Sequence, residues 1–202
     1  MILQLNLSRQ GTGRIENRDV SGSAHNAGTH LYVIADGTSK PNSGELASAL
    51  SHHLLECFRH AHPVVVSCPE HALMLVLTSL DEVHSNICPD FPLASTSYLV
   101  LLVVGHTAIS IHAGDCCLGH LEKSQRLNWV NSPHCGPNWR GDLSHSLIAN
   151  SPARKTLDTT WIMATDGFWA ELSAEDQFKA VVERTLDGCA TEDDVTFMLL
   201  RT

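Results

Sequence analysis

The chain alternates between short apolar runs rich in β-branched residues and longer stretches in which apolar residues recur at helical spacing. The short runs lie at residues 31–35, 97–104, 107–113, 159–165 and 195–200. Most of them stop at Gly or Asp, the residues that commonly end a strand in a turn. The pattern therefore predicts a β-strand in each run.

Helical spacing appears in three places. Residues 44–61 carry apolar side chains three and four positions apart, and residues 70–85 follow the same spacing. Ser173, with Asp176 three positions later, has the spacing of an N-cap for a helix that contains Phe178. These stretches predict three helices separated by strands.

The connections indicate how these elements are arranged. Gly105-His106 joins two β-prone runs and suits a tight hairpin, which makes the paired strands antiparallel. Residues 128–157 are rich in Pro, Gly, Asn and Ser, and predict a long loop. Strands in hairpins with separate long helices favour an α+β sandwich, and a chain of 202 residues without a repeat or linker predicts one domain over 1–202.

Composition narrows the classes of partner. The formal net charge is −9 and no run of Lys and Arg occurs, so binding to a nucleic-acid backbone is not expected. The seven cysteines are scattered and odd in number, and Met1 to Gly13 lacks the pattern of a signal peptide, so we expect a reduced, cytoplasmic protein. The apolar run from Tyr98 to Val104 is far shorter than the roughly 20 residues of a membrane-spanning helix.

Acidic residues stand at three strand ends. Asp36-Gly37 and Asp166-Gly167 follow two β-prone runs, and Asp193-Asp194 precedes a third. One Asp-Gly pair alone is ordinary turn chemistry. Carboxylates gathered at neighbouring strand ends repel one another, however, unless a hard divalent cation such as Mg²⁺ or Mn²⁺ neutralises them. The repetition therefore indicates a metal site.

Seven motifs follow one another between Gly13 and Leu200. They are Arg14 to Asp19, Ala35-Asp36-Gly37, Gly44-Glu45-Leu46-Ala47-Ser48, Ala94-Ser95-Thr96, Gly114-Asp115-Cys116-Cys117, Thr165-Asp166-Gly167-Phe168-Trp169 and Asp193-Asp194-Val195-Thr196. In this order they resemble the metal-dependent protein phosphatases of type 2C (PPM), in particular small bacterial stand-alone members. The resemblance implies a four-layer α-β-β-α sandwich in which helices flank two antiparallel sheets.

The resemblance also implies roles for individual residues. Asp36 would bridge two metal ions, and the carbonyl of Gly37 would be a further ligand. Asp166 and Asp193 would bind the first ion, and Asp19 would support the metal site. Two further assignments follow by the same resemblance: Arg14 would grip the substrate phosphate with its planar, permanently charged fork, and Asp90 would hold a weaker third ion.

The implied activity is hydrolysis of phosphoserine or phosphothreonine by in-line attack of a water that bridges two Mn²⁺ or Mg²⁺ ions. A phosphoprotein would be the substrate, and the enzyme would oppose a Ser/Thr kinase. We expect a monomer without a nucleic-acid or membrane partner.

The sequence departs from the family pattern at several motifs. Arg18 stands where many members have Glu, so a cation lies next to the predicted site, and Thr38 replaces a histidine of eukaryotic members. Cys116 and Cys117 stand where Ser-Arg is usual. Arg18 is the main argument for an alternative, a phosphatase-like regulatory or binding module with weakened catalysis.

Other chemistries receive less support. A zinc site could draw on a histidine-rich helix, where the side chains are His52, His53, Cys57, His60 and His62, with Cys68 and His71 nearby. The simpler interpretation of these residues is a solvated helix face. Cys135 and Arg140 are one residue too close for a cysteine phosphatase, and the sequence has no phosphate-binding Gly-rich loop. A Ser-His-Asp hydrolase stays open, although no Gly-x-Ser-x-Gly motif supports it.

Overall fold

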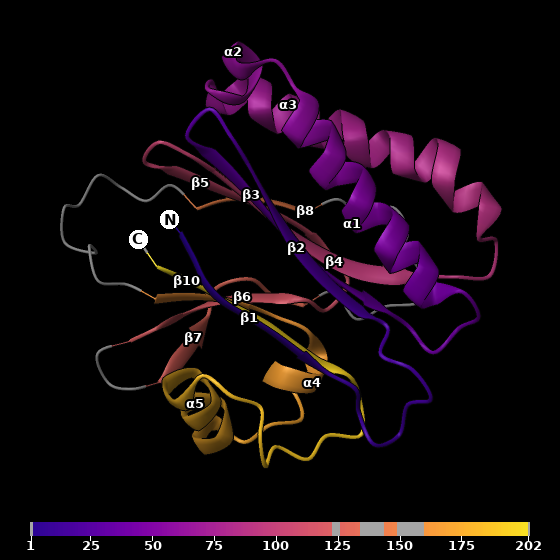
Figure 1. Ribbon diagram of the computed structural model, residues 1–202, viewed down its shortest axis with the longest axis vertical. Coiled ribbons are helices and arrows are strands. Elements are labelled where there is room, and N and C mark those ends of the chain that lie inside the picture. Colours follow the sequence, from indigo (N-terminus) through magenta and orange to yellow (C-terminus); the bar gives the residue numbers. More distant parts are fainter. Residues whose placement is uncertain (1, 123–125, 134–143, 149–159, 202) are drawn as a thin grey trace.

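The computed structural model describes residues 2–122, 126–133, 144–148 and 160–201, and shows two antiparallel sheets of five strands each (Figure 1). The first sheet has the order β2 (Asp19–Asn26), β3 (Thr29–Gly37), β4 (Thr96–Val104), β5 (Thr107–Ala113) and β8 (Ser144–Ile148). The second has the order β1 (Ile2–Arg9), β10 (Val195–Arg201), β9 (Thr160–Ala164), β6 (Cys117–Leu121) and β7 (Leu127–Trp129).

Helices cover the outer face of each sheet. On the first sheet lie α1 (Ser43–His60), α2 (Pro63–Val66), α3 (Pro69–Glu82), the π-helix η1 (Val83–Ile87) and the 3-10 helix η2 (Cys88–Asp90). On the second sheet lie α4 (Asp166–Trp169) and α5 (Ala174–Glu183), as Figure 1 shows. The order of the layers is therefore helix, sheet, sheet, helix.

Successive side chains of a strand point to opposite faces of the sheet, so one strand can contribute to two hydrophobic cores. In β3, Leu31 and Val33 pack with the helices α1 and α3, while Tyr32 and Ile34 face the second sheet. The layer between the sheets is completed by Met163 and other apolar residues of the second sheet. A central strand of such a sandwich is covered on both faces, and β4 is accordingly buried along its whole length.

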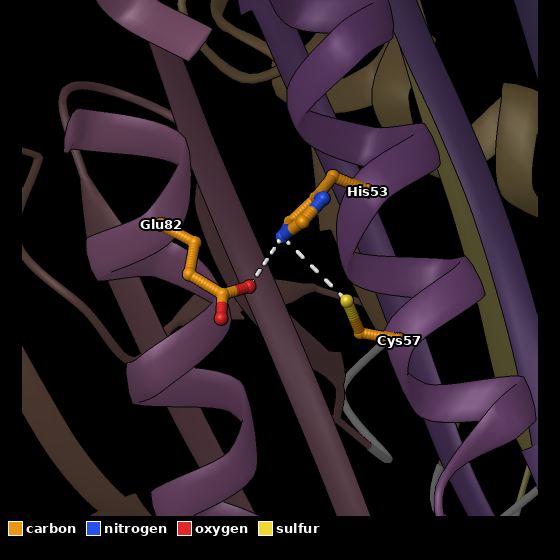
Figure 2. Close-up of side chains that lie close together, drawn as sticks. All are labelled: His53, Cys57 and Glu82. Atoms are coloured by element: carbon orange, nitrogen blue, oxygen red, sulfur yellow. Dashed lines mark hydrogen bonds and ion pairs between the residues drawn. The ribbon is translucent and has the colours of Figure 1, made fainter. Parts of the chain in front are cut away.

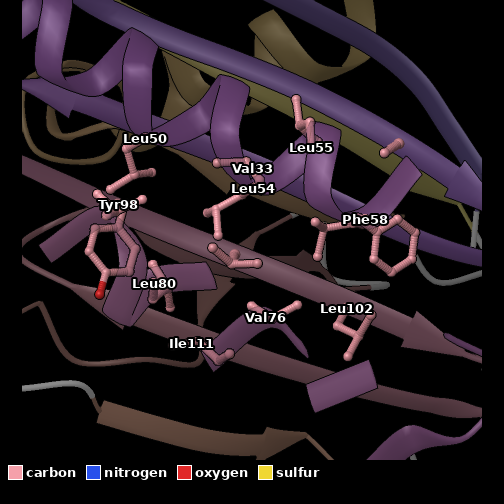
Figure 3. Close-up of a cluster of buried hydrophobic side chains, with 14 of the residues drawn as sticks. Val33, Leu50, Leu54, Leu55, Phe58, Val76, Leu80, Tyr98, Leu102 and Ile111 are labelled. Carbon is pink, nitrogen blue, oxygen red and sulfur yellow. The ribbon is translucent and has the colours of Figure 1, made fainter. Parts of the chain in front are cut away.

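The layer under α1 and α3 depends on helical spacing. Leu50, Leu54 and Phe58 lie on one face of α1 and are buried against the first sheet, together with Val76 and Leu80 of α3 (Figure 3). This packing fixes both helices firmly on the sheet. No helix among the described residues is long and apolar enough to cross a membrane.

Most of the expected elements are confirmed within a few residues of their predicted ends. Five strands, β1, β2, β6, β7 and β8, were not predicted, although Leu3, Leu5 and Leu7 alternate along β1 in the manner of a strand. The predicted loop over 128–157 is wrong where β7 and β8 interrupt it. Its segments 134–143 and 149–157 lie outside the described residues.

Candidate metal centre

The register of β2 and β3 places two of the predicted aspartates opposite each other. Asp19 is the pairing partner of Asp36, at the end of β3. Both side chains are buried. Directly opposite residues of an antiparallel pair have neighbouring side chains when they point to the same face, so the two carboxyl groups interact.

The second sheet contributes the remaining carboxylates. Asp166 follows β9, and Asp193 precedes β10, the neighbour of β9. Thr165 joins the two sheets, because its hydroxyl donates a hydrogen bond of 2.8 Å to Oδ2 of Asp19 and accepts one of 3.0 Å from the backbone N–H of Thr196. The strand ends of both sheets therefore meet at one place.

Electrostatics show that these side chains form one cluster. Burial, followed by the negative charges of Asp19, Asp166, Asp115 and Asp193, raises the pKa of Asp36 well above its ordinary value. A pKa raised by several neighbouring carboxylates marks a place where negative charge is concentrated.

Two neighbours of Asp36 show the same effect. Burial raises the pKa of Asp19 to about 7, although hydrogen bonds from Thr165 and Thr196 act in the opposite direction. Burial and the charges of Asp115 and Asp193 raise the pKa of Asp166 to about 6. Protonation relieves the repulsion within such a cluster, and a divalent cation would relieve it as well.

The donor set fits a hard metal ion. Oδ1 of Asp19 and Oδ1 of Asp166 are buried and accept no hydrogen bond. Buried carboxylate oxygens without a partner are costly, and Mg²⁺ and Mn²⁺ prefer oxygen ligands of this kind. Among the described residues, no three of these aspartates each place a carboxylate oxygen within 4.8 Å of the others. An ion shared by Asp36, Asp166 and Asp193 would therefore require their side chains to move closer together.

Gly37 is required by the close approach of α1. A Cβ on Gly37 would lie 2.6 Å from the backbone N of Gly44 and from the carbonyl group of Ser43. These are backbone atoms in the first turn of α1, which cannot move without displacing the helix. Glycine at the end of β3 therefore lets α1 start directly beside Asp36.

Arg14 is engaged with one of the predicted metal ligands. Its Nε donates a 2.5 Å hydrogen bond to Oδ1 of Asp193, its Nη2 pairs with Oδ2, and its Nη1 donates to the hydroxyl of Ser39. The two side chains are largely covered, with 20% and 18% exposed. The structure therefore places the arginine fork at the edge of the cluster, where it neutralises one carboxylate.

Arg18 has its own partners next to the cluster. Its Nη1 donates a 3.1 Å hydrogen bond to the carbonyl of Thr38, and its Nε donates one of 3.2 Å to Glu16. Thr38 in turn lies within hydrogen-bonding distance of Ser43 and Ser95 through its hydroxyl. The guanidinium is thus held along the loop between β3 and α1.

Two acidic residues position the site without having been predicted to do so. Asp194 is buried and accepts hydrogen bonds of 2.9 Å from the backbone N–H groups of Gly11 and Arg18. Glu171 accepts hydrogen bonds from the backbone N–H groups of Glu192 and Asp193. Asp194 ties the segment that carries Arg14 to the turn that carries Asp193. Only the Asp193-Asp194 pair in the sequence hinted at this function.

Asp115 is a member of the cluster that sequence reasoning missed. It lies in the turn between β5 and β6, half-buried, and its charge raises the pKa of both Asp36 and Asp166. The turn was part of the family resemblance, so the signal was present. Asp90 is exposed in η2, and its role at a third metal site stays a prediction.

Comparisons with known proteins add information at the level of the fold. No family model matches the sequence, and a search of curated proteins gives no match. A bacterial serine phosphatase variant has a TM-score of 0.77 at 18% identity, and the alignment covers 100% of this chain and 98% of that chain. The serine/threonine phosphatase Stp1 from Staphylococcus aureus has a TM-score of 0.72 at 16% identity, covering 100% and 96%.

A third structure agrees with these two. The Mycobacterium tuberculosis serine/threonine phosphatase PstP/Ppp has a TM-score of 0.70 at 17% identity, with 98% of each chain covered. At such low identity the similarity establishes the fold. The predicted α-β-β-α sandwich with two antiparallel sheets is confirmed, and the resemblance to type 2C phosphatases is confirmed as a likeness of fold.

Proposed function

We propose that this chain is a metal-dependent protein phosphatase that hydrolyses phosphoserine and phosphothreonine. The observation that carries the proposal is the concentration of buried and half-buried aspartates around Asp36, whose charges help to raise the pKa of Asp36 well above its ordinary value. A cluster of this kind destabilises a protein that does not use it, so it points to a functional site. The fold shared with bacterial serine/threonine phosphatases supports the same reaction class.

The aspartates would hold two Mn²⁺ or Mg²⁺ ions. Asp36 would be a ligand of both ions, Asp166 and Asp193 would bind the first, Asp19 would support the site, and the Gly37 carbonyl would add an oxygen. When bound, such ions lower the pKa of water and neutralise the charge of a phosphoryl group. Thr165 keeps the Asp19 carboxyl oriented through its 2.8 Å hydrogen bond.

Arg14 would bind the phosphate of the substrate. A guanidinium offers two parallel N–H donors that match two phosphate oxygens. In the structure these donors are taken up by Asp193, so Arg14 has to release Asp193 when phosphate arrives. Release leaves both groups available, Arg14 for the substrate and Asp193 for a metal ion.

The alternative of a regulatory or binding module also draws on this pair. If Arg14 and Asp193 stay joined, the site loses one ligand and its phosphate-binding group together. The enzyme is favoured because unpartnered oxygens of Asp19 and Asp166 are retained in the buried cluster. A module without catalysis gains nothing from that arrangement.

Hydrolysis of p-nitrophenyl phosphate and of a phosphothreonine peptide tests the proposal. The purified protein is titrated with Mn²⁺ and with Mg²⁺, and an EDTA-treated sample provides the baseline. We expect turnover that saturates with metal and disappears with EDTA. The protein could instead be folded, show no turnover at millimolar Mn²⁺ and still bind the phosphopeptide measurably. That result would contradict the proposal of an active phosphatase and support the binding module.

A further inference from the structure

A second group of ligand-type side chains lies on the helical layer, separate from the aspartate cluster. His53 and Cys57 are four positions apart on α1, and Glu82 is the last residue of α3 (Figure 2). Nε2 of His53 lies 2.9 Å from Oε2 of Glu82 and 3.5 Å from Sγ of Cys57. All three ligand atoms lie within 4.8 Å of one another.

Both Glu82 and Cys57 converge on one atom, Nε2 of His53. If Nε2 carries a proton, it donates to Glu82, and the sulfur of Cys57 can only be a weak second acceptor. If Nε2 is unprotonated, it can accept from the thiol but then faces the Glu82 carboxylate lone pair to lone pair. A metal ion would instead take a lone pair from each of the three atoms at once.

Two of the three separations can be compared with those around a tetrahedral zinc ion. With Zn–N near 2.05 Å and Zn–S near 2.3 Å, tetrahedral angles separate nitrogen and sulfur by about 3.6 Å. The observed separation of Sγ and Nε2 is 3.5 Å. For nitrogen and a carboxylate oxygen the same geometry gives about 3.3 Å. The observed 2.9 Å therefore needs only a small side-chain rotation of Glu82.

The backbone beneath the group is rigid, while the ligands themselves are accessible. The two helices are fixed by buried side chains of the core, among them Leu50 and Leu54 of α1 and Leu80 of α3. The side chains of His53 and Glu82 are 28% and 47% exposed, and Cys57 is half-buried. An ion can therefore enter from solvent, and water can fill its fourth position.

We propose that His53, Cys57 and Glu82 form a zinc site that joins α1 to α3. Thiolate and imidazole select Zn²⁺ over Mg²⁺ and Mn²⁺, which distinguishes this site from the all-oxygen aspartate cluster. The charges of one thiolate and one carboxylate balance those of Zn²⁺. The histidine-rich stretch of the sequence thus contributes two ligands, and the third comes from Glu82, which no spacing within that stretch could identify.

The other side chains of that stretch are directed elsewhere. His60 is 79% exposed and contacts Glu56 one turn before it on α1. His62 accepts a hydrogen bond from the backbone N–H of Val64 at the start of α2. Cys68 pairs with Glu70 beside it. None of these three belongs to the group around His53.

Cobalt and zinc titrations of the full chain test the site. Co²⁺ replaces Zn²⁺ in tetrahedral sites, and a thiolate bound to it gives a charge-transfer absorption that oxygen ligands do not give. Excess Mg²⁺ keeps the aspartate cluster occupied. We expect a thiolate–cobalt absorption in the unmodified protein that one equivalent of Zn²⁺ abolishes. Absence of the absorption in the folded, reduced protein would overturn the proposal.

Variants assign the ligands. Cys57→Ser should lose the absorption, whereas Cys68→Ser, a change at another half-buried cysteine of the same layer, should retain it. Replacement of one ligand should cost more than the roughly 10- to 100-fold that outer-shell changes cost, so His53→Ala and Glu82→Gln should weaken binding by about 100-fold or more. A charge-transfer band that persists in Cys57→Ser would contradict the assignment.

Thermal unfolding gives a readout that is independent of colour and of phosphatase activity. Zn²⁺ should raise the Tm of the unmodified protein and of Cys68→Ser, because it binds the folded arrangement of α1 and α3. His53→Ala is a surface change and should fold, so its Tm should not respond to Zn²⁺. An equal rise in His53→Ala would place the bound zinc elsewhere and overturn the proposal.

Discussion

Among single residues, Asp36 is the one on which the proposed metal site most depends. It lies opposite Asp19 in the sheet, and burial together with four other aspartates raises its pKa well above its ordinary value. Without a bound cation, the surroundings of this carboxyl group therefore disfavour its ionised form. Residues that keep such a charge in a buried position commonly use it for a metal ion or for catalysis.

Asp36→Asn should abolish metal-dependent turnover while the fold is retained. The amide is nearly the same size and carries no charge, so it removes a ligand without adding strain. Turnover in saturating Mn²⁺ should fall by about 100-fold or more, since the loss of an oxygen ligand exceeds an outer-shell effect. Asp187→Asn, at an exposed aspartate, is the matched control. Equal activity in both variants would remove Asp36 from the site.

Arg18 allows a second prediction at this scale. Its guanidinium is bound by Thr38 and Glu16 next to the carboxylates, so its charge weakens cation binding by long-range repulsion. Arg18→Glu changes the charge by two units, and at the edge of a solvent-exposed site this is worth about 0.5–1 kcal/mol. We expect about two- to fivefold tighter Mn²⁺ binding in a calorimetric titration. Arg18→Gln should give about half the free-energy gain, and an unchanged affinity in both would show that the Arg18 charge does not act on the metal site.

At the scale of elements, the junction between β3 and α1 connects the core to the site. The strand ends with Asp36 and Gly37, and the helix starts at Ser43 within contact of Gly37. The sequence predicted both elements and the turn residues between them. It could not predict the close approach of backbone to backbone, because this contact depends on how α1 packs through Leu50 and Leu54.

Gly37→Ala should impair metal binding more than it impairs folding. The new Cβ would lie 2.6 Å from backbone atoms of Ser43 and Gly44, so the β3–α1 junction has to shift beside Asp36. We expect at least about tenfold weaker Mn²⁺ activation and a loss of stability of about 1–3 kcal/mol. Gly44→Ala is the control, since the three atoms nearest to its Cβ belong to Arg18 and lie at 3.3 Å or more. Identical metal activation in the two variants would contradict the importance of this contact.

At the scale of the whole molecule, strand ends from both sheets bring distant parts of the sequence together. Asp19 and Asp36 come from one sheet, and Asp166 and Asp193 flank neighbouring strands of the other. Motif order allowed these residues to be predicted. The partnership of β1 with β10 and the contacts of Asp194 and Glu171 could not be predicted, because they depend on pairing between residues far apart in the chain.

Stability of the metal-free protein should respond to pH through this cluster. The pKa of Asp19 is raised from 3.8 to about 7, so between these values the folded state binds more protons than the unfolded state. The contribution of Asp19 to the free energy of unfolding is therefore present at low pH and is lost as the pH rises through about 7. One pKa unit corresponds to about 1.4 kcal/mol.

Urea unfolding in EDTA at pH 5 and at pH 8 measures this effect. The free energy of unfolding of the unmodified protein should fall between the two pH values by at least about 1 kcal/mol more than that of Asp19→Asn, which cannot ionise. In saturating Mn²⁺, the unmodified protein and Asp19→Asn should change by the same amount between the two pH values, because the ion replaces the protons. An equal change in the free energy of unfolding of the two proteins in EDTA would show that the pKa of Asp19 is not raised in the folded protein.

The aspartates at these strand ends are proposed to bind two metal ions. Anomalous diffraction from crystals equilibrated with Mn²⁺ locates such ions directly. We predict two peaks roughly 3.5–4 Å apart among Asp19, Asp36, Asp166 and Asp193, and no peak pair in crystals of Asp36→Asn. Crystals of the unmodified protein that show no manganese at this cluster, or manganese only at the surface, would contradict the account.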